Sequence, residues 1–389
     1  MNKLTKPTAD DVFESILYNY LYPCTDTIKN TVHWIFSQDI KDEQSLRCME
    51  LEENFVESVA KSKELPFVFD KSMEGTIIKK GNRLGELFYD LLVQQNVSPA
   101  NLNSYLVSTN FKIRAISHPP YTPRYEESEN LKVLASVAEA LNLNHANFTG
   151  NPMSKISNEG LLEGELINSF VTRLREAMKR KSFKARAAER KKESSQSFTK
   201  TKRYIDRLCT NNPGSLYGVR MVIYYSEKYA KSITLEGSHT HLMSFLETSG
   251  TDLTSYSPIG WWWKREYMTE LSYYYSVILF FDIVKNPYNE ILIKEVYDRH
   301  WSSVTEGRGE YYVPSILQRD YQRCGMGVLQ QMGKSGERLD LFLSITQRML
   351  MRDIFLRLEP NKKFNHFGMG ELPKLAEVTP VNNTFSPYR

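Results

Sequence analysis

The chain has 389 residues, of which 41% are hydrophobic, so it is long enough for two or three domains with ordinary folded cores. Its net charge of +4 hides an asymmetry. Residues 173–207 hold fourteen Lys or Arg and four acidic residues, a local balance of +10, so the rest of the chain carries −6. The longest apolar run, about residues 274–284, is too short to span a membrane, which argues against an integral membrane protein.

The amino terminus and the cysteines indicate the cellular compartment that we expect for this protein. Residues 1–7 lack the apolar core of a signal peptide. No pair of cysteines has the spacing of metal ligands, so we expect reduced thiols in a cytoplasmic protein. The cysteines are Cys24, Cys48, Cys209 and Cys324.

Residues 1–159 are predicted to form a mostly helical region, and no motif indicates its role. Thr8–Asp11 is a good helix start, because a polar cap is followed by early acids, and Pro23 ends that helix. The further expected elements are helices from Asp26 to Phe36 and from Asp42 to Ala60, short strands over 66–69 and 76–78, a helix over 84–92, a loop over 119–123 and a helix over 126–142.

Residues 160–210 are predicted to form a long helix and a basic linker. An apolar face at helical spacing runs from Leu161 to Leu174, and the pattern then becomes almost wholly basic up to residue 193. The stretch Ser194–Ser197 is expected to break this helix. A strong turn over 211–214 precedes the next domain.

The basic side chains of this segment are candidate DNA ligands. Cations that neutralise phosphates release counterions, so their affinity for DNA falls with salt, and they position a duplex more than they specify its sequence. The alternatives are a solvated linker helix, or pairing with the acidic remainder of the chain. The candidates are Arg173, Arg175, Lys179, Arg180, Lys181, Lys184, Arg186, Arg190, Lys191, Lys192, Lys200, Lys202 and Arg203.

Residues 211–375 are predicted to form an α+β domain, which a tail over 376–389 follows. Patterns rich in β-branched and aromatic residues predict strands at 219–225, around Glu266 and at 273–282. Together with the helical regions before it, this domain places the whole chain in the α+β class.

Four blocks follow one another over about residues 217–373: the strand 219–225, the strand pair at 266–282, a helix ending at Trp301 with the loop 305–311, and residues 325–327 with a long helix and the segment 364–370. In this order they resemble the replication proteins of inoviruses and the related YagK/YfjJ C-terminal domain of prophages. The resemblance implies a Rep-like (RRM-like) antiparallel sheet backed by helices. It also implies an ancestral activity that nicks one DNA strand through a covalent tyrosyl-phosphate.

Two departures from the family pattern predict that nicking is lost. In the family a strand carries a His-x-His pair that grips a divalent cation, and here the corresponding residues are Tyr274, Tyr275 and Ser276. The tyrosine and lysine of the family's late helix are missing from the matching segment 343–348. Glu266 resembles an acidic residue of some nickases, but we expect it to pair with a neighbouring Lys or Arg. We therefore predict no catalytic residue, no metal and no cofactor.

Three further patterns have both a structural and a functional interpretation. His239 and His241 would share a side on a strand, but the preceding residues favour a loop that leads into a helix, where positions i and i+2 do not share a face. Trp261–Trp263 could stack on single-stranded bases, although core packing is favoured. Gly307 and Gly309 could let a loop approach phosphate, and a plain turn explains them equally well.

The leading hypothesis is a non-catalytic DNA-binding protein of a phage, prophage or satellite element, whose N-terminal region serves homo-oligomerisation or partner contacts. The second is a structural or interaction protein of a mobile element, such as a capsid scaffold or a docking platform for a phage or host protein. The third is an active nickase that uses His239 and His241, or an unaligned tyrosine. Salt-dependent DNA binding, a DNA-independent protein complex and Mn²⁺-dependent cleavage would distinguish the three.

Overall fold

The computed structural model describes residues 40–72, 75–94, 109–110, 125–143, 146–156, 160–213, 216–248, 257–268, 271–284, 289–312, 327–329, 336–358 and 363–371. The two helices expected before residue 37, the loop over 119–123 and the tail over 376–389 lie outside these residues. Mixed helices and antiparallel strands confirm the α+β class.

The chain divides into two compact units. The first unit comprises residues 1–198, 267–270 and 345–362, and the second unit comprises residues 199–266, 271–344 and 363–389. These limits differ from the domain limits expected at residues 159 and 210. The reason is that two helices continue through the boundary: α8 (Lys181–Asn211) and α13 (Gly336–Phe355).

Four helices form the core of the first unit: α3 (Ile40–Lys61), α4 (Arg83–Gln94), α6 (Glu129–Ala140) and α7 (Glu163–Lys179). Phe55 of α3 stacks on Phe170 of α7 with 6.1 Å between ring centroids, and Phe88 of α4 contacts Phe170 edge-on at 5.8 Å. All three side chains are fully buried. The helices expected over 42–60, 84–92 and 126–142 are thus confirmed, because their apolar stripes converge on one aromatic core.

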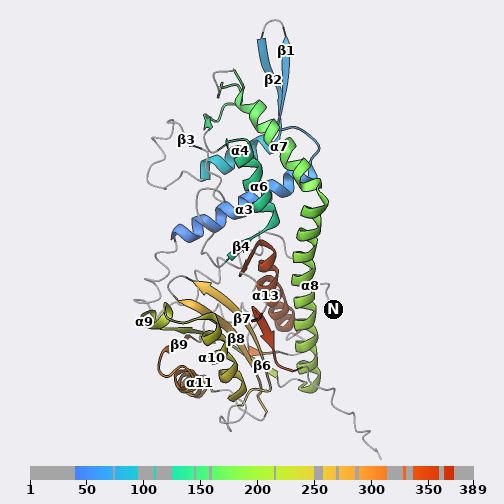
Figure 1. The fold of residues 1–389 in the computed structure, drawn as a ribbon. Helices are drawn as coiled ribbons and strands as arrows, with labels where there is room; N and C mark the ends of the chain where they lie inside the picture. The colour runs from blue at the N-terminus through green and yellow to red at the C-terminus, as the bar shows by residue number, and fades with distance from the viewer. Residues whose placement is uncertain are drawn as a thin grey trace, which may run out of the picture. The chain divides into compact units, whose positions relative to one another are not determined.

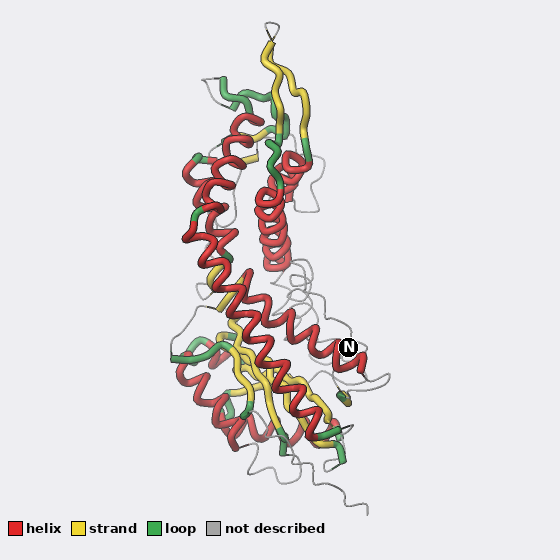
Figure 2. Tube along the Cα trace, turned by 90° about the vertical axis from the view of Figure 1, so that its right-hand side faces the viewer, coloured by secondary structure: helices red, strands yellow, loops and turns green. Residues whose placement is uncertain are grey.

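Short strands complete the first unit. β1 (Phe67–Ser72) and β2 (Gly75–Gly81) confirm the two expected short strands, and they pair as an antiparallel hairpin that projects beyond the helices of this unit (Figures 1 and 2). β4 (Tyr125–Glu127) pairs with β11 (Leu356–Leu358), and β3 (Thr109–Asn110) pairs with β5 (Asn147–Phe148).

The helix expected over residues 160–193 is wrong in two respects. It is divided at Arg180, whose ψ of 137° is extended, so α7 ends at Lys179 and α8 begins at Lys181. It does not end at Ser194–Ser197, because α8 continues through these residues. The Ser194 hydroxyl donates to the Leu350 carbonyl at 2.7 Å, and the Ser195 and Ser197 hydroxyls donate to carbonyls one turn earlier in the helix, as helical serines often do.

The second unit is built on a six-stranded sheet in the order β10-β6-β8-β7-β12, with β9 also pairing with β6. Every pairing with a described register is antiparallel. The strands are β6 (Leu216–Tyr225), β7 (Gly260–Met268), β8 (Ser272–Asp282), β9 (Gly309–Tyr312), β10 (Gly327–Val328) and β12 (Phe367–Met369). The strands expected at 219–225, around Glu266 and at 273–282 are confirmed.

Helices cover both faces of this sheet. On one face, odd-numbered residues such as Met221 and Val277 pack against α10 (Leu235–Thr248) and α11 (Glu290–Val304), beside which the short α9 (Glu227–Ala230) follows β6 (Figure 1). On the other face Phe280 contacts the rings of Tyr204 in α8 and Phe342 in α13 at 6.4 and 6.0 Å. Because successive strand residues alternate between faces, each strand contributes to two separate layers of packing.

Candidate functional site

Two residues of the segment that resembles the inovirus replication proteins, Glu266 and Ser276, are buried on the face of the sheet that carries Phe280. Glu266 is 6% exposed and lies 4.0 Å from Lys264 Nζ, so the expected pairing of this acid is confirmed. Ser276, which is 3% exposed, accepts a hydrogen bond from Arg220 Nε at 3.1 Å. Glu266 and Ser276 therefore each have a polar partner on this face, an ion pair for the first and a hydrogen bond for the second.

Tyr275 belongs to the opposite face of the sheet. Its side chain is fully buried, and its hydroxyl lies 2.8 Å from the Ser238 hydroxyl of α10. Burial raises the pKa of Tyr275 to about 12, although the Ser238 hydrogen bond opposes this shift. A buried phenol with a raised pKa is a poor nucleophile, because the phenolate that would attack phosphorus is disfavoured. Tyr274 is partly exposed.

The two histidines lie on α10, which begins at Leu235, so the loop expected before them is part of the helix. His241 Nδ1 lies 3.0 Å from the Tyr225 hydroxyl. His239 packs against the rings of Trp263 and Phe364, with centroids 5.8 and 4.9 Å away. Burial lowers the pKa of both histidines, which favours neutral rings. The two imidazoles thus have separate partners.

The tryptophans and the glycine loop are explained by packing. Trp262 is fully buried and donates from Nε1 to the Thr201 hydroxyl at 3.2 Å, while Trp263 is 3% exposed on the other face of the sheet. A Cβ on Gly309 would collide with the Trp301 indole. Gly307 has φ +74°, which favours glycine in the turn before β9. Core packing of Trp262 and Trp263, and a plain turn at the glycines, account for these residues.

The basic segment differs from the buried residues described above, because most of its cationic side chains are exposed to solvent. On α8, Lys181, Lys184, Lys191 and Lys192 are exposed, and their spacing places them within one arc of about 100° around the helix. The exposed candidates are Arg173, Lys179, Arg180, Lys181, Lys184, Arg186, Lys191, Lys192, Lys200 and Arg203. We call those from Arg173 to Lys192, all in the first unit, the basic face.

Three of the candidate DNA ligands, Arg190, Arg175 and Lys202, contact other parts of the chain. Arg190 is 5% exposed and donates hydrogen bonds to the carbonyls of Glu126, Glu127 and Asp353, so the prediction that it contacts DNA is corrected: its guanidinium joins α8 to β4 and α13. Arg175 donates to the Val59 and Glu64 carbonyls from a half-buried position.

Lys202, in the second unit, is half-buried and pairs with Asp206 one turn later at 2.7 Å. Such an i, i+4 pair is an ordinary helix-surface contact. Lys200 and Arg203 are exposed in the same stretch of α8.

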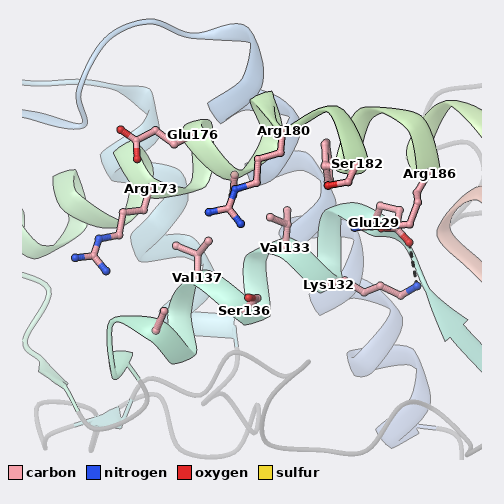
Figure 3. Close-up of a pocket in the computed structure, with 13 residues that line it drawn as sticks. Glu129, Lys132, Val133, Ser136, Val137, Arg173, Glu176, Arg180, Ser182 and Arg186 are labelled. Atoms are coloured by element: carbon pink, nitrogen blue, oxygen red, sulfur yellow. Dashed lines mark hydrogen bonds and ion pairs between the residues drawn. The ribbon is translucent and has the colours of Figure 1, made fainter.

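A groove of about 400 Å³ lies in the first unit between α6, the end of α7 and the first turns of α8. Its charged lining consists of Lys132, Arg173, Arg180 and Arg186 with Glu129 and Glu176, so cations exceed acids by two. In Figure 3, Arg173 and Arg180 project from α7 toward the side of α6 that carries Val133 and Val137, while Glu176 points away. We call this feature the α6–α7 groove.

One end of the groove is held by an ion-pair network. Glu129 accepts from Lys132 Nζ at 3.0 Å and from Arg186 Nε at 2.6 Å, and Lys132 also pairs with Glu126 at 2.6 Å. Although burial of Glu129 opposes ionisation, the hydrogen bonds from Arg186 and Lys132 outweigh it and hold the pKa of this carboxyl below its ordinary value. The network fixes Lys132 and Arg186 at the groove.

Sequence reasoning named Arg173, Arg180 and Arg186 as basic residues but did not group them around a groove. It missed Lys132 and Ser136 of α6, which line the same groove. The signal in the sequence was a stripe of small side chains on α6 at Val133, Ser136, Val137 and Ala140. Whether such a stripe lines a groove depends on which helix lies opposite it.

Comparisons with protein-family models, with curated proteins and with solved structures found no match to this chain. The resemblance to the replication proteins of inoviruses and the related prophage domain therefore stays a prediction. Within the described ranges, no three His, Cys, Asp or Glu side chains gather as metal ligands would. None of the helices in those same ranges combines the length and the apolar character of a membrane span.

Proposed function

We propose that this chain is a cytoplasmic, non-catalytic nucleic-acid-binding protein of a phage, prophage or satellite element, descended from a rolling-circle initiator. The basic face would contact phosphates, and the second unit would retain the ancestral sheet as a scaffold. The observation that carries the proposal is the concentration of exposed cations in one stretch of 20 residues from Arg173 to Lys192.

Electrostatics supports a polyanionic partner. Eight exposed cations occur in this stretch against two exposed acids, Glu176 and Glu189, and the exposed Glu193 directly follows it. Glu129, the partner of Arg186, belongs to α6 rather than to α8. A face with this excess of positive charge attracts phosphates over a distance of about one Debye length, roughly 8–10 Å at ordinary salt. Lysine ammonium groups contact phosphates without reading bases, so we expect weak dependence on sequence.

The non-catalytic part of the proposal rests on the motif positions. In this resemblance Tyr274 and Ser276 stand where the family carries its metal-binding histidines, so a phenol and a hydroxyl replace the two imidazoles. Ser276 is buried and hydrogen-bonded to Arg220, and Tyr274 is partly exposed. His239 and His241, the residues of the nickase alternative, each contact different aromatic rings. Incubation with supercoiled and single-stranded DNA and Mn²⁺ should leave both substrates intact, and cleavage would contradict this part.

The salt dependence of DNA binding tests the main proposal. Each lysine–phosphate contact steepens the slope of log K against log salt by about 0.9 for duplex DNA. Changing Lys181, Lys184, Lys191 and Lys192 together to glutamine should therefore reduce the slope by about 3 to 4 and weaken binding at low salt. Fluorescence anisotropy with a labelled duplex, measured over a salt series, gives both quantities.

The matched control removes the same charge elsewhere. Lys63, Lys155, Lys228 and Lys231 are exposed and lie outside the basic segment, so their change to glutamine should alter the slope much less. Equal effects of the two quadruple variants would show that only net charge matters. Absence of binding at low salt would remove the proposal altogether.

A second candidate function is docking to a protein partner, and the β1–β2 hairpin favours it. Val68 and Ile77 are 42% and 61% exposed on this hairpin. Asp70 lies directly opposite Ile77, so the exposed side carries both apolar and charged groups. If the hairpin binds a partner, Val68→Ser with Ile77→Ser should abolish a DNA-independent complex seen by size exclusion, and leave the salt slope for DNA unchanged.

A further inference from the structure

The α6–α7 groove has the shape and lining of a small-molecule site. Its α6 side is formed by Val133, Ser136, Val137 and Ala140, which share one side of that helix at spacings of three and four residues. Small side chains at Ser136 and Ala140 leave room between the helices. The volume of about 400 Å³ lies in the range of pockets that hold organic ligands.

The α7 side presents the complementary charge. Arg173 lies on α7 and Arg180 directly follows its last residue, and the two flank the small Ala177. Within the described part of the chain, neither guanidinium makes a hydrogen bond or ion pair with another side chain. Both project toward α6 (Figure 3), so they are available to an anion in the groove.

The two ends of the groove differ in character. At one end Lys132 and Arg186 are held by Glu129, and at the other the lining is mainly apolar, with Val137 and Ala140 facing Arg173. An occupant that suits both must carry a negatively charged group for the arginines and a flat or apolar body for the valines and alanines. Guanidinium groups suit phosphate oxygens in particular, because their planar donors match two oxygens at once.

We propose that the α6–α7 groove binds a nucleoside phosphate, with the phosphate on Arg173 and Arg180 and the base against Val133 and Val137. The ligand is either a free nucleotide or the 5′-phosphorylated end of a strand, which share this chemistry. The site shares Arg173 and Arg180 with the basic face, but it does not depend on nucleic-acid binding along the lysines of α8.

Binding of adenosine diphosphate to the full-length chain, measured by isothermal titration calorimetry, tests the proposal. Saturable binding is expected, with unphosphorylated adenosine weaker by about tenfold or more because it lacks the charged contacts. Arg173→Gln with Arg180→Gln should weaken adenosine diphosphate by about the same factor and leave adenosine almost unchanged.

Variants that fill the groove distinguish binding inside it from attraction by the overall positive charge. Ser136→Trp fills the groove from α6 without changing a cation, and Ala140→Trp does so from the next turn, so each should abolish binding. Glu139→Trp is the control, because Glu139 is exposed on the same helix but does not line the groove. Binding that persists in both groove-filling variants would overturn the proposal.

Short oligonucleotides identify the source of the ligand. If the site serves strand ends, a 5′-phosphorylated trinucleotide should bind about tenfold more tightly than its 5′-hydroxyl form and than adenosine diphosphate. If it serves free nucleotides, adenosine diphosphate should bind at least as tightly as either trinucleotide. Failure of adenosine diphosphate and of the phosphorylated trinucleotide to bind would refute the site.

The two proposals fail in different ways. The four-lysine variant of α8 should weaken duplex binding and keep adenosine diphosphate binding, whereas Ser136→Trp should keep duplex binding and lose adenosine diphosphate binding. Loss of both activities in either variant alone would contradict the separation of the groove from the lysines of the basic face.

Discussion

Glu53 makes the stability of the first unit depend on pH. Its carboxyl is fully buried on α3 and accepts hydrogen bonds from the Ser128 hydroxyl and from Asn130 Nδ2, the latter at 2.7 Å. Ser128 is the N-cap of α6 and accepts from Leu131 N at 3.0 Å, so the carboxyl supports a helix start. Burial raises the pKa of Glu53 from 4.5 to about 7, although both hydrogen bonds oppose this shift.

The difference between the pKa of Glu53 in the folded chain and in the unfolded chain sets the sign and size of its effect on stability. The unfolded chain releases the Glu53 proton near pH 4.5, while the folded chain holds it until about pH 7. The associated stability is fully present below pH 4.5, falls between pH 4.5 and pH 7, and is lost above pH 7. A shift of this size corresponds to about 3 kcal/mol in total, at about 1.4 kcal/mol for each pH unit.

Glu53→Gln keeps the shape of the side chain and its hydrogen-bonding capacity but does not titrate. Urea unfolding of both proteins, followed by far-ultraviolet circular dichroism from pH 5 to pH 8, gives the comparison. The free energy of unfolding of the wild type should fall with pH relative to the variant, and the variant should be the more stable protein above pH 7. Because the comparison is a difference, other titrating groups cancel.

The control for this measurement is Glu86→Gln, since Glu86 is an exposed acid of the same unit that pairs with Arg83. Its unfolding free energy should follow the wild type across the pH range to within about 0.5 kcal/mol. Parallel curves for the wild type and Glu53→Gln would refute the argument, because they would show that the Glu53 carboxyl is already ionised in the folded chain at pH 5.

Two further predictions concern residues that sequence reasoning treated as functional. Arg190→Met should lower the free energy of unfolding by about 3 kcal/mol, because three carbonyls lose a charged donor. The control Lys191→Met, on the exposed side of α8, should change this free energy by less than about 0.5 kcal/mol. Midpoints of urea unfolding test both variants. Gly309→Ala should cost more than Gly307→Ala, because the first forces a Cβ into Trp301 and the second only strains a positive φ, at about 1 kcal/mol. Thermal unfolding with the reverse order would contradict this packing.

Local patterns determined most of the secondary structure. The strands β6 and β8 were predictable because β-branched and aromatic residues alternate between two packed faces. The helices α3, α4 and α6 were predictable because their apolar residues recur at helical spacing. The limits of α7 and α8 were not, since Ser194 is retained in the helix by the distant carbonyl of Leu350.

The candidate site was predictable in its charge and not in its geometry. The excess of Lys and Arg between Arg173 and Lys192 is a property of the sequence and survives in the structure as the basic face. The α6–α7 groove is not, because its lining comes from segments that the chain order separates, such as Ser136 and Arg180. No periodicity within one helix reveals which helix will face it.

The sequence by itself determined the α+β composition, the positions of most helices and strands, and the charge of the basic segment, because each depends on residues that are neighbours in the chain. Only the tertiary structure decided that Arg190 and Glu53 are buried while Lys191 is exposed, and that Ser136 lies across a groove from Arg180. Burial and juxtaposition depend on contacts between distant segments, and the free energy of those contacts belongs to the assembled fold rather than to any local stretch.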